Sequence, residues 1–391
     1  MTDDVPTPWL NRERLIAWAG VFLMLEVAIF VMLVLQQANI AFGVGLSSID
    51  FLSFYAAGKL VLAGTPALVY DQAAHYVAEQ QVSAPGVPYV FFYYPPVFLL
   101  ICAGLATLPY GMALLVFEGA TFLLFAAVLR RILGERGRTW LIPVLAFPAT
   151  FWNFGQGQNA YLSAALLGTF GLLLERRPFT AGAALGALCF KPHLGLLTPF
   201  ALAAAGRWRA FIAAGVSAGV LLLLSLLLLG LDPWAAYLAA MAGADGTYAS
   251  GRINFAGFVS LFGGLRLMGV PIQVAYVVQG IVTFGCGVAV VLVWRQREAP
   301  ALRQAALLAA TLLAVPLVLL YDQMIAVLAL AWLMRSAGPE GLRGWERLLV
   351  VVAYPLTLMA PVLAIGLKAP VALGVDIVLL TLCLRRALRP G

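Results

Sequence analysis

The fold is decided by the stretch GQGQNAYLSAALLGTFGLLLERRPFTAGAALGALCFKPHLGLLTPFALAAAGRWR, residues 155–209. Its apolar runs lie between short polar breaks, which read GQGQN, ERR, KPH and GRWR in chain order. Arginine occurs in the second and the fourth break and is absent from the other two. Because arginine-rich breaks stay on the cytoplasmic side of a bilayer, this stretch is predicted to cross a membrane repeatedly, with GQGQN and KPH on the outer side.

The same alternation continues in both directions along the 391-residue chain. The chain is 63% hydrophobic and 10% charged, whereas a soluble domain has about 25% charged residues. A helix needs about 20 apolar residues to span a bilayer, and the apolar runs fit about twelve crossings with both chain ends inside. We therefore expect an all-α, multi-pass protein of the inner (cytoplasmic) membrane of the cell, with residues 1–391 forming one integral membrane domain.

The net charge of +7 does not indicate nucleic-acid binding, because the arginines lie at helix ends, where they meet anionic membrane lipids. All but two of the arginines, Arg252 and Arg266, are placed on the inner side. The four cysteines lie within apolar runs and lack disulfide or metal-ligand spacing. They are expected to pack in the core, and we expect no metal and no cofactor.

The longest polar interval, residues 38–92, follows the first apolar run and is expected to form the first outer loop. Two amphipathic helices are expected inside it, at about 50–63 and about 71–82, with Gly64-Thr65-Pro66 as the break. The next region, 94–131, fits either one crossing or two. The arginines that follow it favour one crossing.

The polar residues that could carry chemistry gather on the outer side. Asp50 lies just after the first crossing and could act as a general base toward a sugar hydroxyl. Its simpler interpretation is a helix N-cap, since Ser and Asp favour helix starts. Asp322, at the end of a short apolar run, is either a second carboxylate facing the same cavity or part of a solvated turn.

Amides and cations accompany these carboxylates. Gln156, Gln158 and Asn159 belong to a glycine-rich turn, and their amides can both donate to and accept from sugar hydroxyls; the alternative is a plain turn before a capped helix. Lys191 suits a phosphate as a compact point charge, or it extends to the membrane interface. His193 is either part of the same site or a packing residue.

The two outer arginines and one tyrosine complete the candidates. Arg252 and Arg266 could bind a lipid phosphate, although solvation in a loop would also account for Arg252. Tyr94, in the motif YYPP, is either a residue of the aromatic belt at the membrane surface or a ring that stacks on a sugar.

Several of these motifs resemble glycosyltransferase family 87, within the GT-C membrane glycosyltransferases. They are SIDFLSFYAAGKLVLAGTPALVYD at 48–71, YYPPVFLL at 93–100, LPYGMALLVF at 108–117, residues 155–199 and YDQMIAVLALAW at 321–332. The likeness runs from about residue 46 to 205 and continues more weakly to about 335. The family includes polyprenol-phosphate-mannose-dependent mannosyltransferases, so the resemblance implies a GT-C fold. It also implies a conserved GT-C-like module over residues 1–230, which includes the first outer loop, and C-terminal helices over 231–391 that vary within the family.

The resemblance further implies an inverting transfer of one sugar from a polyprenyl-phosphate donor, without a nucleotide, to a lipid or glycan acceptor at the outer face. It implies that Asp50 activates the acceptor. At Tyr321-Asp322 the chain departs from the family, where a histidine is often found, and Asp322 could substitute for it.

Our hypothesis is such a transferase, with its active site facing the periplasm or cell exterior. The donor phosphate would be held by some of Lys191, Arg252 and Arg266. A transporter or flippase of a lipid-linked sugar remains an alternative, as does a ligase that moves a whole glycan. An outward-only cavity favours the enzyme, whereas a cavity reachable from both sides would favour transport.

Overall fold

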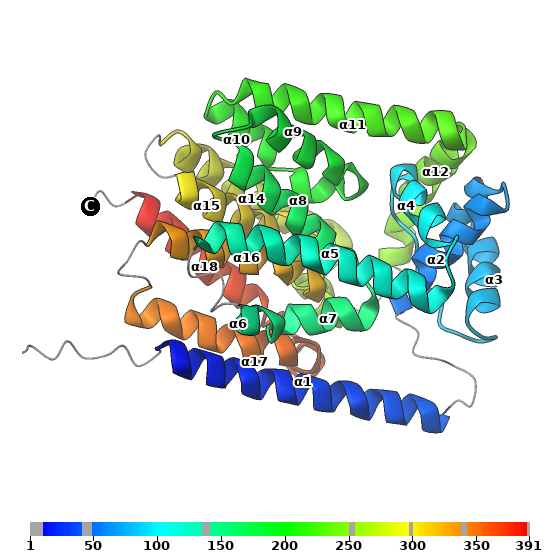
Figure 1. Cartoon of the computed structure of the whole chain (residues 1–391), viewed down its shortest axis with the longest axis horizontal. Helices are drawn as coiled ribbons and strands as arrows, with labels where there is room; N and C mark the ends of the chain where they lie inside the picture. Colours follow the sequence, from blue (N-terminus) through cyan, green and yellow to red (C-terminus); the bar gives the residue numbers. More distant parts are fainter. Residues whose placement is uncertain are drawn as a thin grey trace, which may run out of the picture.

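The computed structural model describes residues 11–40, 49–134, 141–249, 255–296, 300–337 and 342–388. In this part of the chain the regular structure is helical, apart from one isolated bridge between Phe258 and Leu319. Most of the long helices run side by side along the long axis of the molecule (Figure 1). The all-α expectation is therefore confirmed.

Within the described ranges, five helices are long and apolar enough to cross a membrane. They are α1 (Arg12–Ile40), α5 (Tyr110–Leu133), α11 (Trp208–Leu229), α14 (Ile272–Trp294) and α17 (Gly344–Leu367). On α11, large apolar side chains such as Leu223, Leu227 and Leu228 point outward and are exposed. Apolar surface of this extent needs an apolar solvent, so the chain is a multi-pass membrane protein.

Shorter helices fill the space between the long ones. They are α6 (Leu141–Leu145), α7 (Pro148–Gln156), α8 (Ala160–Leu173), α9 (Pro178–Gly186), η3 (Ala187–Phe190), η4 (Pro192–Gly195), α10 (Thr198–Ala204), α15 (Pro300–Ala314), η6 (Leu320–Gln323), α16 (Met324–Ser336) and α18 (Leu373–Leu388). Nearly every residue of α15 is buried, as expected for an apolar helix in the centre of a bundle.

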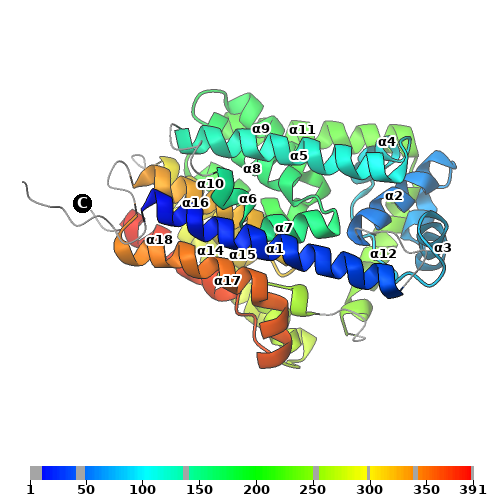
Figure 2. The ribbon, with the colours of Figure 1, turned by 60° about the horizontal axis from the view of Figure 1, so that its bottom comes forward.

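A group of smaller helices covers the end of the molecule at which α1 ends and α5 begins (Figures 1 and 2). It contains α2 (Ile49–Leu62), η1 (Pro66–Tyr70), α3 (Gln72–Val82), α4 (Pro96–Leu105) and α12 (Asp232–Ala249). Since Asp50 lies in the first turn of α2, we call this the Asp50 end. Two further short helices, η5 (Phe255–Gly257) and α13 (Leu261–Leu267), pack against α17 and α14, respectively.

The helices expected in the first outer loop occur close to their expected positions, but α2 is not amphipathic. Residues 51–58 of α2 are all buried, because the helix packs against both α3 and α4. The expectation of an interfacial helix with one exposed face is therefore wrong for α2. Because α2 packs against two neighbouring helices, it needs apolar residues on more than one face.

The region 94–131 contains one long helix and one short one. Helix α4 has ten residues, which is about 15 Å of helix and too short to cross a hydrocarbon core of about 30 Å. Helix α5 has 24 residues and is among the five that can cross. It ends with Arg130 and Arg131 in its last turn, at the opposite end of the molecule from Asp50.

Candidate active site

Asp50 is hydrogen-bonded to a residue that lies far from it in the sequence. Nε2 of Gln158 donates to Oδ2 of Asp50 at 3.1 Å. Oε1 of Gln158 accepts from the Tyr94 hydroxyl at 3.2 Å and from the Asn159 backbone N–H at 2.9 Å. These two donors fix the side-chain amide so that its NH₂ group faces the carboxylate.

The turn between α7 and α8 holds Gln158 in place. Gly157 ends α7 in the left-handed conformation, with φ 64°, which glycine adopts without strain. Asn153, fully buried in α7, clamps the turn: its Oδ1 accepts from the Ala160 N–H at 3.0 Å and its Nδ2 donates to Glu118 at 3.1 Å. The Gly-Gln-Gly-Gln-Asn sequence therefore forms a tight turn that also presents one amide to Asp50.

A buried ion pair forms the second part of the site. Nζ of Lys191, between η3 and η4, lies 3.0 Å from Oδ1 of Asp322 in η6. Both side chains are at least 95% buried. The other carboxylate oxygen, Oδ2, accepts from the Leu319 N–H at 3.2 Å, and the ammonium lies 5.0 Å from the centre of the Tyr321 ring.

The two parts belong to one electrostatic cluster. Burial raises the pKa of Asp50 to about 6, against the opposing effects of the Gln158 hydrogen bond and the positive charge of Lys191. Burial also raises the pKa of Tyr94, and the charges of Asp50 and Asp322 act on it in the same direction. A carboxyl group with a pKa near 6 can accept a proton at neutral pH, which suits a general base.

The structure thus brings together five of the candidate residues: Asp50, Tyr94, Gln158, Lys191 and Asp322. Two others adjoin them. Asn159 is fully buried next to Gln158, and His193 is half-buried with Lys191 and Asp322 acting on it electrostatically.

The remaining candidates lie apart from this cluster or outside the described residues. Gln156 ends α7 and is half-buried, and its side chain makes no hydrogen bond to the cluster in the described part of the chain. Arg266 donates to the Val270 carbonyl at 2.7 Å and lies 5.6 Å from the Phe255 ring centre, so its contacts stabilise the end of α13. Arg252 lies outside the described residues.

A fully buried pair in α3, His75 and Glu79, lies next to α2. Neither residue was singled out from the sequence. Nε2 of His75 contacts the Ser53 carbonyl oxygen at 3.2 Å, and Oε2 of Glu79 accepts from the Val90 N–H at 3.2 Å. Nδ1 of His75 lies 3.7 Å from Oε1 of Glu79, and burial lowers the pKa of His75 to about 4 and raises that of Glu79 to about 8. Their spacing of four residues places them on one helix face, a signal the sequence does contain.

An aromatic hollow of about 140 Å³ adjoins the site at the Asp50 end. Its wall includes Tyr70, Tyr89, Phe92 and Tyr93. Tyr70 donates to the Tyr94 carbonyl at 2.9 Å, which links this hollow to the cluster. As to metals, the described residues contain no group of three His, Cys, Asp or Glu side chains that could hold an ion.

The profile of glycosyltransferase family 87 matches residues 92–319. The chain belongs to glycosyltransferase family 87. It is therefore a membrane glycosyltransferase. Tyr94, Gln158 and Lys191 lie within the matched region, while Asp50 and Asp322 lie on either side of it. Neither the curated proteins nor the solved structures contain a significant match to the chain.

Proposed function

We propose that this glycosyltransferase moves one sugar from a polyprenyl-phosphate donor to a hydroxyl of a lipid or glycan acceptor, with inversion at the anomeric carbon. The observation that carries the proposal is the Asp50–Gln158 contact beside the Lys191–Asp322 pair. A base with a pKa of about 6 and a buried cation are the two groups that such a displacement requires.

In the proposed reaction Asp50 accepts the proton of the acceptor hydroxyl. At the same time the oxygen of that hydroxyl forms a bond to the anomeric carbon. The bond from that carbon to the phosphate oxygen breaks on the opposite face, and polyprenyl phosphate leaves with the electron pair. Lys191 stabilises the charge that develops on the leaving group. Asp322 orients the lysine, and Gln158 orients Asp50.

The other polar groups of the cluster are assigned to binding. Tyr94 and Asn159 would contact the sugar or acceptor, with His193 at the phosphate side near Lys191. We assign Arg266 to the stability of α13, because its guanidinium is engaged there. Arg252 remains a second candidate for the donor phosphate, and Gln156 a candidate for the acceptor.

The proposed orientation places the Asp50 end outside and the chain ends inside, with about twelve crossings in one membrane domain. Arginines at the opposite end support this orientation. They include Arg131, Arg335 and Arg386, which lie in the last turns of α5, α16 and α18, respectively. Short helices such as α9 and α10 fit a bundle in which neighbouring protein shelters the ends of broken segments.

The direct test is Asp50→Asn, measured in membranes with a labelled polyprenyl-phosphate sugar. We expect turnover to fall at least about 100-fold, since general bases contribute about 10²–10⁴ in rate. Asp71→Asn is the matched control, because Asp71 is an exposed cap that accepts from the Ala74 N–H at 2.9 Å. Full turnover by Asp50→Asn at normal expression would refute the assignment.

A further inference from the structure

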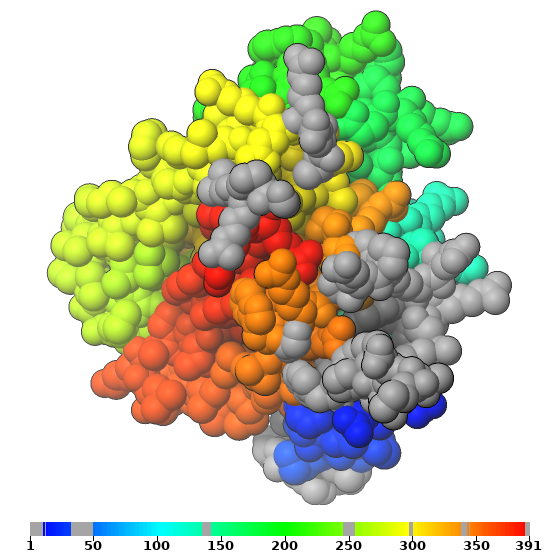
Figure 3. Space-filling view, turned by 90° about the vertical axis from the view of Figure 1, so that its left-hand side faces the viewer, coloured from blue at the N-terminus to red at the C-terminus, as the bar shows by residue number. Residues whose placement is uncertain are grey.

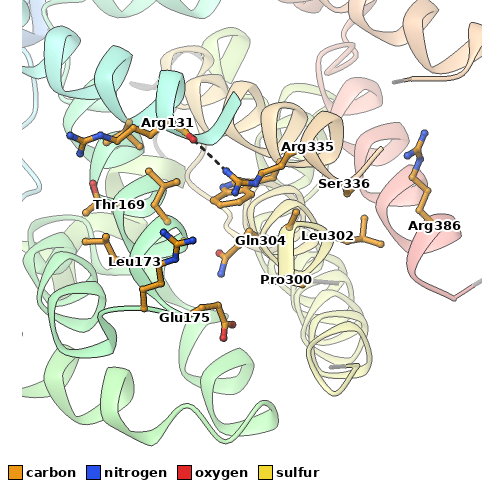
Figure 4. A pocket seen from close by; sticks show the side chains of 16 residues that line it. Arg131, Thr169, Leu173, Glu175, Pro300, Leu302, Gln304, Arg335, Ser336 and Arg386 are labelled. Carbon is orange, nitrogen blue, oxygen red and sulfur yellow. Dashed lines mark hydrogen bonds between the residues drawn. The ribbon is translucent and has the colours of Figure 1, made fainter. Parts of the chain in front are cut away.

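A large hollow lies apart from the candidate active site. It has a volume of about 940 Å³ and lies at the opposite end of the molecule, between α5 and α8 on one side and α15 and α16 on the other (Figure 4). Figure 3 views this end, where α18 lies beside α15 and α16. A volume of this size is within the range of binding sites for organic molecules.

The lining of this hollow carries an excess of positive charge. Arg131, Arg176, Arg335 and Arg386 line it together with one carboxylate, Glu175. Arg386 is already paired with Glu346, which lies outside the lining, so Arg131, Arg176 and Arg335 supply the excess. Glu175 is already paired with Arg207 and, at 3.1 Å, with Arg303. The one acidic lining residue is thus neutralised from outside the hollow. Arginines are expected at this end of a membrane protein, but a hollow between them is not.

A buried donor without a partner points to a ligand. Trp332 lines the hollow and is 5% exposed, and its Nε1–H has no hydrogen-bond acceptor among the described residues. The Arg335 guanidinium lies 5.5 Å from the Trp332 ring centre. Buried donors are almost always satisfied in native proteins, so an oxygen-bearing ligand at this position would complete the structure.

We infer that this hollow binds a phosphate group, carried either by an anionic membrane lipid or by a small soluble phosphate ester. Arginine guanidinium groups and an indole N–H are all donors, and phosphate oxygens are acceptors that match them. Leu172, Leu173, Pro300 and Leu302 form an apolar wall beside the arginines, which suits the first carbons of a lipid. The site is separate from the reaction proposed at Asp50.

Native mass spectrometry of the detergent-purified protein tests the inference by titration with phosphatidylglycerol and with phosphatidylcholine. Arg176→Gln removes an exposed arginine of the lining, and Arg177→Gln removes its exposed neighbour, which does not line the hollow. We expect Arg176→Gln to weaken phosphatidylglycerol binding about tenfold, the scale of one lost charge-assisted hydrogen bond, and Arg177→Gln to change it less than about twofold. Trp332→Phe keeps an aromatic ring and removes the N–H, so it should weaken the same binding several-fold.

Competition with glycerol phosphate separates the two sources. Displacement of phosphatidylglycerol by glycerol phosphate assigns the site to a soluble phosphate ester, and binding that resists displacement assigns it to a lipid. Equal binding of the two lipids together with no binding of glycerol phosphate would overturn the inference. So would an equal loss in Arg176→Gln and Arg177→Gln, or unchanged binding in both Arg176→Gln and Trp332→Phe. Elution volume and thermal stability show that each variant is folded.

Discussion

The pKa of Asp50 is set by three influences on its carboxyl group that partly cancel. Burial alone would raise its pKa further, and the Gln158 hydrogen bond and the Lys191 charge bring it back to about 6. The fraction of Asp50 that is ionised therefore increases as pH rises through 6. If Asp50 is the base, the rate increases over the same range.

Substituting Gln158 should move this pH dependence in a defined direction. Gln158→Ala removes a hydrogen bond that favours the ionised form, so the pKa of Asp50 rises and the acidic limb of the rate profile moves to higher pH. If the pKa rises by one unit, the ionised fraction of Asp50 at pH 6 falls about fivefold, so the rate should fall about fivefold more at pH 6 than at pH 8. Gln158→Glu adds a like charge beside Asp50 and should shift the limb further. A limb that stays in place, or moves to lower pH, in both variants contradicts the role of Gln158.

The sequence indicates the membrane side of these residues but not their pairing. Asp50 and Gln158 are 108 positions apart, and Lys191 and Asp322 are 131 apart. Charge asymmetry between loops assigns each residue to a side. Which side chains then meet depends on how the helices pack, and that information is spread over the whole chain. The same limit applies to Arg266, whose side is predictable but whose contacts with Val270 and Phe255 are not.

At the scale of helices, the site depends on the close approach of α2 and α4. A Cβ on Gly58 would lie 2.1 Å from the Cys102 carbonyl oxygen and 2.7 Å from the Ala106 Cβ. No side chain fits there, so the glycine lets α2 lie directly on α4. Asp50 lies in the first turn of α2 and Tyr94 lies two residues before α4, so both belong to the segments that this contact holds together.

Gly58→Ala should therefore push the two helices apart. We expect a loss of about 1–3 kcal/mol in stability, the usual range for an extra methyl group in a packed interior, together with reduced turnover. Gly104→Ala in α4 is the matched control, because a Cβ there meets no atom within 4 Å. The measurement is the melting temperature in detergent alongside activity. A Gly58→Ala variant as stable as Gly104→Ala would show that α2 and α4 can separate without strain.

Helix ends are predicted better than helix surroundings, because caps are local. The Asp71 side chain caps α3 by accepting from the Ala74 N–H, and α3 covers 72–82 where 71–82 was expected. The predicted exposed face of α2 was wrong because one of its packing partners, α4, follows about 40 residues later in the chain. Local sequence fixes where a helix begins, while burial depends on partners that are remote in sequence.

At the scale of the molecule, the two polar ends differ in chemistry. The Asp50 end carries Asp50, the amide of Gln158 and the buried Lys191–Asp322 pair, and the opposite end carries the arginines in the last turns of α5, α16 and α18. Helix α1 begins and α18 ends at the arginine-rich end (Figure 1). If the charge rule holds, the proposed reaction takes place on the side away from the cytoplasm.

Cysteine labelling in intact cells tests this orientation. Cys189 is half-buried, whereas Cys102, Cys286 and Cys383 are buried. The variant Cys189→Ser should therefore show little labelling of its native cysteines, and the new cysteines are introduced into it. Ala73→Cys, on the exposed face of α3, should react with a membrane-impermeant maleimide. Arg209→Cys, exposed at the start of α11, should react only after the membrane is permeabilised. A bilayer core of about 30 Å blocks a charged reagent. Labelling of Arg209→Cys but not of Ala73→Cys in intact cells would therefore reverse the assigned topology, and labelling of both from the same side would abolish it. The outer location of the Asp50 cluster would then be lost with it.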